Sequence, residues 1–207
     1  MSRVKKAVSG ESGPVTRILD VAERLVQSRG YNGFSYADVA AELQVTKASL
    51  HYHFAGKAEL GEALINRYTR RFAEALVAID AERVGVEAKL AAYAAVYAGV
   101  LKEKRMCLCG MLAAEYETLP SAMRAAVVHF FDENEAWLEQ VLTQGMFEGA
   151  LHFEGVARDE AQLIISTLEG AMLVARPYGD LDRFQASAQR LLATLTTSSQ
   201  GRSGSTK

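Results

Sequence analysis

The sequence predicts an all-α protein, and three of its properties favour that class. Apolar residues make up 49% of the 207 residues, and only three residues are proline. Alanine, leucine and glutamate, which all favour helices, are abundant along the chain. No segment alternates apolar and polar residues for long, as a half-buried strand would. A chain of this length suits one or two domains with a sizeable buried core.

The first expected helix begins at Pro14, with Thr16 as its cap, and ends at Gly30. Glycine is favoured just after the last residue of a helix, because it adopts a left-handed conformation without strain. We expect this helix to support the two helices that follow. Its buried stripe is expected at Ile18, Leu19, Ala22, Leu25 and Val26.

Residues 34–57 predict two short helices joined by a tight turn, followed by the start of a third. Ser35 is placed as an N-cap, and Asp38 stands three residues later, where a capping box has its acidic or amide partner. Thr46 offers a second capping hydroxyl, and the next helix begins at Lys47. These signals predict a helix-turn-helix.

The second helix of this pair is expected to have one buried and one exposed side. Leu50 and Phe54, four residues apart, are expected to point inward. The opposite side is short and mildly basic, and it carries donors that suit phosphates or base edges. Its residues are Lys47, Ala48, Ser49, His51, Tyr52 and His53.

The stretch from Arg17 to Leu60 resembles the amino-terminal DNA-binding domain of TetR-type transcriptional regulators. The resemblance rests on three segments in order, ILDVAERLVQSRGYNGFS, DVAAELQVTKASLHYHF and AGKAEL. Two residues depart from the family pattern. Gln44 stands where the family usually has glycine in the turn, so a non-glycine residue must adopt a left-handed conformation. His51 replaces the usual tyrosine.

The resemblance implies contacts to DNA from this segment. Lys47 and Ser49 are our choices for base contacts, and Ala48 suits a thymine methyl group. Thr46 is expected to cap the helix and to contact DNA as well. The residues expected at phosphates are Ser35, Tyr36, His51, Tyr52, His53 and Lys57.

The charge distribution agrees with this placement. Residues 1–57 carry eight Lys and Arg against five Asp and Glu, which gives +3, although the whole chain has a net charge of −2. Residues 58–207 carry fifteen against twenty, which gives −5. The positive end of the chain therefore coincides with the helix-turn-helix.

Beyond the helix-turn-helix, apolar periodicity predicts six more helices. The first is long and runs from Lys57 to about Asp80, joining the amino-terminal part to the remainder. The others are expected to begin near Glu87, near Cys107, at Ser121 after Pro120, at Asp159 and at Leu181.

Nine helices, three in a head and six in a body, match the TetR architecture. The resemblance implies that residues 14–57 form a DNA-binding head and residues 58–197 a ligand-binding and dimerisation body, with flexible tails at 1–13 and 198–207. It also implies that the last two long helices form a four-helix dimer interface. Apolar periodicity alone would allow a monomer.

Three basic residues of the amino-terminal tail either lie along DNA or remain solvated, namely Arg3, Lys5 and Lys6.

Cys107 and Cys109 allow three interpretations. Zinc is the weakest, since a C-x-C pair lacks nearby ligands. The second is a pair of buried cysteines. The third is a sensor thiol at Cys107. Arg105 and the start of the following helix would lower the pKa of this thiol. The segment CLCGMLAAEYETLPSAMR resembles electrophile- and hypochlorite-sensing TetR regulators, in which a lysine assists where this chain has Arg176.

Aromatic and methionine side chains of the body are candidates for lining an inducer pocket, although residues at such helical spacing also form ordinary core. They are Tyr93, Tyr97, Met111, Phe130, Trp137 and Met172. The expected polar anchors in such an apolar pocket are Glu115, Glu169 and Arg176.

The sequence and the resemblance together predict a cytoplasmic, homodimeric repressor that binds a pseudo-palindromic operator in double-stranded DNA and responds to a small-molecule or electrophile inducer. No cofactor is expected. No apolar run is long enough to cross a membrane, and the first residues do not form a signal peptide. An enzyme is disfavoured because no hydrolase, metalloprotease or phosphate-loop motif is present. The alternative is a helical small-molecule-binding or interaction protein without specific DNA binding.

Overall fold

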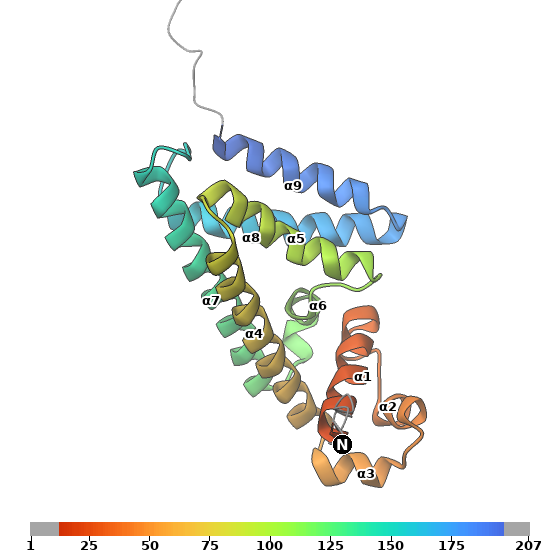
Figure 1. Ribbon diagram of the computed structural model, residues 1–207. Coiled ribbons are helices and arrows are strands. Elements are labelled where there is room, and N and C mark those ends of the chain that lie inside the picture. Colours follow the sequence, from red (N-terminus) through yellow and green to blue (C-terminus); the bar gives the residue numbers. More distant parts are fainter. Residues whose placement is uncertain (1–12, 197–207) are drawn as a thin grey trace, which may run out of the picture.

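The computed structural model describes residues 13–196, and within that range every regular element is helical. This confirms the all-α prediction. Nine α-helices and two short 3₁₀ helices are present there, arranged as a small head and a larger body (Figure 1). The tails that we expected at 1–13 and 198–207 lie outside the described residues except for Gly13, and so do Arg3, Lys5 and Lys6.

The head contains three helices, α1 (Pro14–Arg29), α2 (Tyr36–Leu43) and α3 (Lys47–His53). Helix α1 begins at Pro14 and ends at Arg29. The next residue, Gly30, has a φ of 84° and a ψ of 169°, a positive-φ conformation that glycine adopts more readily than other residues. The prediction for Thr16 was wrong. Thr16 lies inside the first turn, because the helix begins two residues earlier and Gly13 occupies the cap position.

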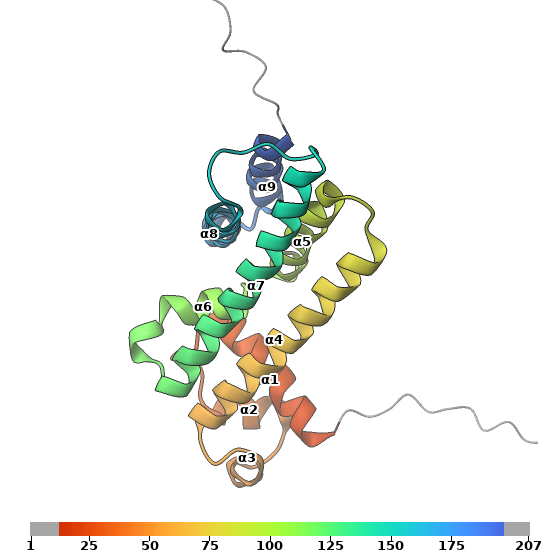
Figure 2. The same cartoon turned by 90° about the vertical axis from the view of Figure 1, so that its left-hand side faces the viewer.

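Helix α4 (Lys57–Glu82) belongs to both parts of the molecule. Figures 1 and 2 show it leaving the head beside α1 and running alongside α7 into the body. Close approach near its start requires Gly61, since a Cβ atom there would lie 2.5 Å from the sulfur of Met123 and 3.2 Å from the ring of Tyr31. The head and α7 therefore meet at one small residue of α4.

The body contains the remaining helices. They are α5 (Val86–Lys102), α6 (Leu108–Ala114), η1 (Tyr116–Thr118), α7 (Ser121–Phe147), α8 (Ala157–Ala175), η2 (Arg176–Tyr178) and α9 (Leu181–Thr196). Helix α7 packs on α4 and α8, and α8 packs in turn on α9 and α5. In Figure 1, α5, α8 and α9 lie together at the end of the molecule that is farther from the head. Buried side chains of the head and the body form one continuous core.

Charged side chains fix α1 of the head against α4. Arg67 on α4 donates to Glu23 at 2.5 Å and to Asp20 at 2.7 Å, and Arg71 contacts Glu23 at 3.3 Å. The side chains of Glu23 and Arg67 are only 8% and 10% exposed, so this ion pair is desolvated. Removing one member of a buried pair is costly, because the other is left as an uncompensated charge.

A second set of contacts joins the end of α1 to the body. The carboxylate of Glu115 accepts hydrogen bonds from the backbone N–H groups of Tyr31 and Asn32. The guanidinium of Arg176 donates to the carbonyl of Ser28. The orientation of the head is therefore set by polar contacts from α4, from the segment after α6 and from the end of α8.

We expect Arg67→Met to lower the free energy of unfolding by about 3 kcal/mol, because Glu23 would lose its closest cation in a buried position. Arg71 would still contact Glu23, which keeps the loss at the lower end of the range for buried pairs. Urea denaturation followed by circular dichroism measures the change. The matched control is Arg70→Met, whose exposed pair with Glu74 is 3.8 Å long and should contribute less than about 1 kcal/mol. Equal losses in the two variants would contradict the role given to Arg67.

Candidate nucleic-acid interface and internal sites

The capping signals around α2 and α3 are present as predicted. The backbone N–H and the hydroxyl of Ser35 donate to the carboxylate of Asp38 at 2.7 and 2.6 Å. The hydroxyl of Thr46 accepts the backbone N–H of Ser49 at 3.2 Å. Between the helices, Gln44 adopts the left-handed conformation, with φ of 56° and ψ of 43°. These contacts define where α3 begins and how it leaves the turn.

Helix α3 has the two expected sides. Leu50 is 1% exposed, and Phe54, which directly follows the helix, is also buried. The other side faces away from the core, and Tyr52 is 86% exposed on it. In Figure 1, α3 lies at the end of the molecule opposite α9. Of the predicted contact residues, those exposed on or next to α3 are Thr46, Lys47, Ala48, Ser49, His51 and Tyr52, and His53 is partly exposed.

Tyr36 is only partly exposed and supports the end of α3. Its hydroxyl donates to the carbonyl of Phe54 at 3.1 Å, and its ring packs on His51 with centroids 4.8 Å apart. Burial and the nearby carboxylate of Glu59 raise the pKa of Tyr36 to about 12. Nδ1 of His51 lies 3.1 Å from the carbonyl of Ala55. Tyr36 and His51 thus hold each other where α3 ends.

Lys57 is turned toward the interior of the head. Its ammonium donates to the carbonyl of Phe34 and lies over the rings of Tyr31 and Phe34, 4.5 and 4.4 Å from their centroids. Burial lowers the pKa of Lys57. In this conformation the side chain positions the loop before α2 and is not extended toward solvent. Its predicted phosphate contact stays a prediction.

Most of the aromatic residues that we considered for a pocket lie in the core. Tyr93, Tyr97, Phe130 and Met172 are each at most 2% exposed. The hydroxyls of Tyr93 and Tyr97 are 3.1 Å apart, and that of Tyr93 donates to Asn134. These contacts satisfy the buried hydroxyl groups within the protein.

Trp137 lies at the border of this cluster. Its ring stacks on Tyr93 with an interplanar angle of 18°, and its indole N–H donates to Asp80 at 2.9 Å. The structure therefore places the indole between α4, α5 and α7 as a packing residue with a satisfied donor.

The three predicted polar anchors do not converge on these aromatic residues. Glu115 and Arg176 contact the head, as described above, and the guanidinium of Arg176 also lies 3.4 Å from the sulfur of Met111. Glu169 lies instead beneath α6, where a Cβ atom on Gly110 would come within 2.2 Å of its carboxylate.

The expectation that the pKa of Cys107 is lowered was wrong. Cys107 is 1% exposed, and burial, together with the nearby carboxylate of Glu169, raises the pKa of its thiol. The guanidinium of Arg105 contacts Gln27 and Glu103 instead of the thiol. The hydroxyl of Tyr68 lies 3.7 Å from the sulfur. Both cysteines are free and buried.

Glu169 is the acid of this buried cluster. One of its carboxylate oxygens has no hydrogen-bond partner in the part of the chain that the structure describes. Burial raises the pKa of Glu169 to about 7, although its interaction with Cys107 opposes the shift. The charge of Glu169 therefore changes near neutral pH.

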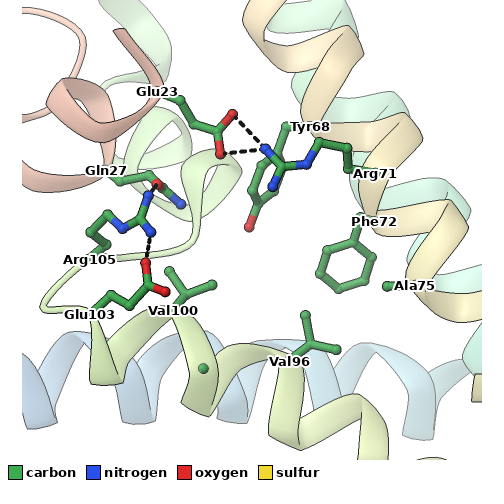
Figure 3. Close-up of a pocket in the computed structure, with 11 residues that line it drawn as sticks. Glu23, Gln27, Tyr68, Arg71, Phe72, Ala75, Val96, Val100, Glu103 and Arg105 are labelled. Atoms are coloured by element: carbon green, nitrogen blue, oxygen red, sulfur yellow. Dashed lines mark hydrogen bonds and ion pairs between the residues drawn. The ribbon is translucent and has the colours of Figure 1, made fainter. Parts of the chain in front are cut away.

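A recess of about 280 Å³ opens between α1, α4 and α5 (Figure 3). The head contributes Glu23 and Gln27 to its wall, and the body contributes Arg71, Phe72 and Val96, among others. This recess was not predicted from the sequence, because its residues come from three helices far apart in the chain. Glu23 could have indicated the recess, because it is a charged residue beside Ala22 in the buried stripe of α1.

Two family models match separate parts of the chain. Residues 18–64 match the family model described as bacterial regulatory proteins, tetR family. Residues 86–190 match the model described as transcriptional regulator LmrA/YxaF-like, C-terminal domain. The repressor NemR of Escherichia coli K12, described as an HTH-type transcriptional repressor, is 25% identical over 187 residues, which cover 86% of this chain and 92% of NemR.

Solved structures show the same fold. A TetR-family transcriptional regulator from Agrobacterium tumefaciens has a TM-score of 0.85 and 31% identity, over 88% of this chain and 97% of that protein. A TetR transcriptional regulator from Legionella pneumophila has a TM-score of 0.83 and 32% identity, over 90% of this chain and all of that protein. Among the described residues, no helix is sufficiently long and apolar to span a membrane.

The raised pKa of Glu169 predicts that stability falls as pH rises. Between the ordinary glutamate pKa of 4.5 and about 7, the folded protein keeps a proton that the unfolded chain has released. Ionising the buried carboxyl therefore costs stability across this window, by about 3 kcal/mol for a shift of this size. We expect Glu169→Gln to flatten the loss of unfolding free energy between pH 5 and 7.5, measured by urea denaturation at several pH values.

The control for this measurement is Glu62→Gln, which removes an exposed carboxyl of α4 and should keep the wild-type pH profile. A wild-type profile in Glu169→Gln would show that Glu169 ionises as an ordinary carboxyl does.

Proposed function

The chain belongs to the TetR family of bacterial transcriptional regulators, and from this premise we propose that it is a repressor that binds a pseudo-palindromic operator as a homodimer and releases it on binding a small molecule. The exposed side of α3 is the observation that carries the proposal. A short helix with a capped start, one apolar side and one exposed side rich in donors has the form of a recognition helix.

In this proposal α3 enters the major groove. Lys47 and Ser49, both exposed in the first turn, reach base edges, and Ala48 meets a thymine methyl group. Phosphates are contacted from the surrounding polar residues and fix the register of the helix. They are Ser35, Thr46, Tyr52 and His53, with Tyr36, His51 and Lys57 acting mainly by positioning the ends of α2, α3 and the loop before them.

The dimer is proposed to form through α8 and α9. Leu163, Leu173 and Val174 on α8 are between 51% and 61% exposed in the single chain, so they present apolar surface without a partner. Gly170 lies on the same helix, and a Cβ atom there would meet no atom within 4 Å, which leaves room for close approach of another helix. A second copy would cover this side and place two α3 helices in successive major grooves, about 34–36 Å apart.

A small-molecule signal is favoured over oxidation of Cys107. A sensor thiol reacts as the thiolate, and the buried Cys107 has a raised pKa and no contact with Arg105. The recess between α1, α4 and α5 instead touches head and body at once. Binding there would influence the orientation of the two heads directly.

We place the functional division at 14–57 for DNA binding and 58–197 for ligand binding and dimerisation. The boundary falls at the first turn of α4, whose continuous helix links the two units. The head is not separate in packing, because buried residues of α1 and α4 share one core.

We expect Lys47→Ala to weaken binding to the operator by about 1–3 kcal/mol and to relax base preference, since a base contact would be lost while the fold is unchanged. DNA selected by the wild-type protein from fragments of its own upstream region provides the target, and fluorescence anisotropy at fixed salt provides the affinity. The control is Arg83→Ala, an exposed residue that follows the far end of α4 and should leave affinity unchanged. Wild-type binding by Lys47→Ala would exclude the proposed base contact, and failure of the wild-type protein to select DNA would favour a ligand-binding protein without specific DNA binding.

We expect Leu173→Glu to shift the protein from dimer to monomer, because a charge would be buried in the proposed α8–α9 interface. Sedimentation equilibrium measures the mass directly. Val77→Glu is the matched control, since Val77 is 69% exposed on α4 and lies outside that interface. A wild-type protein that sediments as a monomer, or a Leu173→Glu variant that remains dimeric, would contradict this arrangement.

A further inference from the structure

The recess between the head and the body continues into a second, more open hollow. The inner recess measures about 280 Å³, and the outer hollow is lined by Asp20, Arg24, Ser28 and Lys104 in addition to residues that both share. The shared residues are Glu23, Arg71, Glu103 and Arg105. Together they form a site with an inner chamber and a charged mouth, which we call the head–body recess.

The part of the head–body recess that lies between α4 and α5 carries apolar side chains. Phe72 of α4 faces Val96 and Val100 of α5 across it (Figure 3). Gly99 also lines this chamber, and a Cβ atom there would meet nothing within 4 Å. The chamber therefore offers an aromatic ring and two branched side chains to a hydrocarbon group, and the missing side chain of Gly99 leaves space beside them.

The mouth of the head–body recess has unused positive charge. Both shared acids already have partners, since Glu23 is bound by Arg67 and Arg71, and Glu103 by Arg105. Arg71 uses only one of its terminal nitrogens for Glu23, and its side chain is 56% exposed.

Lys104 adds a second available cation. Within residues 13–196 it forms no ion pair, and its φ of 58° is uncommon for a residue other than glycine. An anion that enters the mouth can therefore accept hydrogen bonds from the guanidinium of Arg71 and the ammonium of Lys104. The two shared acids repel it only weakly, because both are already paired with arginines.

We propose that the head–body recess binds a small organic anion, with a carboxylate at Arg71 and Lys104 and an apolar group against Phe72, Val96 and Val100. The chamber, at about 280 Å³, lies just below the ~300–1,000 Å³ range of small-molecule pockets, which suits a monocarboxylate of about ten non-hydrogen atoms. Binding itself is independent of the proposed function. Its effect on DNA rests on that function.

The site also supplies a route from ligand to head. Arg71 contacts Glu23 of α1, so a ligand carboxylate at Arg71 competes with a contact that joins α1 to α4. Glu23 keeps Arg67, so its buried carboxylate stays paired when Arg71 turns to the ligand. Because walls of the recess come from both parts, an occupant alters their separation and lowers operator affinity.

Three probes with the same phenylpropyl body test the ligand class, namely 3-phenylpropionate, its amide and 3-phenylpropylamine. Isothermal titration of the full chain without DNA is expected to give the tightest binding for the acid, with at least about tenfold weaker binding of the amide and no binding of the amine. Equal affinities for the three compounds, or preference for the amine, would overturn the proposal.

Two variants test the location. Gly99→Phe places a ring in the open chamber and should abolish binding of the acid, while circular dichroism confirms that the helix is retained. Arg71→Gln should weaken the acid about tenfold and leave the amide unchanged, because only a charged hydrogen bond is lost. The matched control is Arg70→Gln, a neighbouring exposed arginine outside the recess. Wild-type affinity for the acid in Gly99→Phe would place the ligand elsewhere.

Operator binding is measured separately, so the two proposals can fail independently. Loss of operator binding without any probe would refute the proposed function and leave the titration result intact. If the acid binds to the recess, we expect it to reduce operator affinity at least about fivefold. An unchanged operator affinity in saturating acid would overturn the proposed coupling through Arg71 and Glu23.

Discussion

The position of the head depends on the buried ion pair between Glu23 of α1 and Arg67 of α4. Both side chains are nearly inaccessible to water, and the Nε atom of Arg67 has no hydrogen-bond partner among the described residues. Desolvating two charges offsets much of their attraction, so such a pair is better suited to fixing one orientation than to adding stability. The contacts from Glu115 and Arg176 then complete the junction between head and body.

Local features of the fold could be predicted because they depend on neighbouring residues. Ser35, Thr46 and Gln44 act through hydrogen bonds and backbone angles within a few positions, and each has the predicted geometry. The starts of the helices were predicted within about two residues for the same reason. Thr16 was misassigned because proline at the first helical position and threonine near it give competing start signals.

Properties that depend on tertiary packing could not be predicted in the same way. The sequence places basic residues before Cys107, but the segment at 103–106 directs Arg105 toward Gln27, and burial then dominates the pKa of the thiol. Glu115 and Arg176 are polar residues in apolar segments, a pattern that fits a ligand anchor and a contact to the head equally well. Only the tertiary contacts between α1 and the body distinguish these roles. The head–body recess is formed by the same packing of α1 against the body.

Helix α4 connects the head and the body mechanically. It is a single continuous helix of 26 residues that contacts the head at its start and the body toward its other end. A helix of that length spans about 39 Å, so a tilt of only ~5° displaces its far end by about 3.4 Å. That displacement equals roughly one base-pair step along DNA. In the proposed dimer, two protomers that tilt in opposite senses would double the mismatch. A change too small to disturb the packing of either core would then be sufficient to put the two α3 helices out of register with the grooves of the operator.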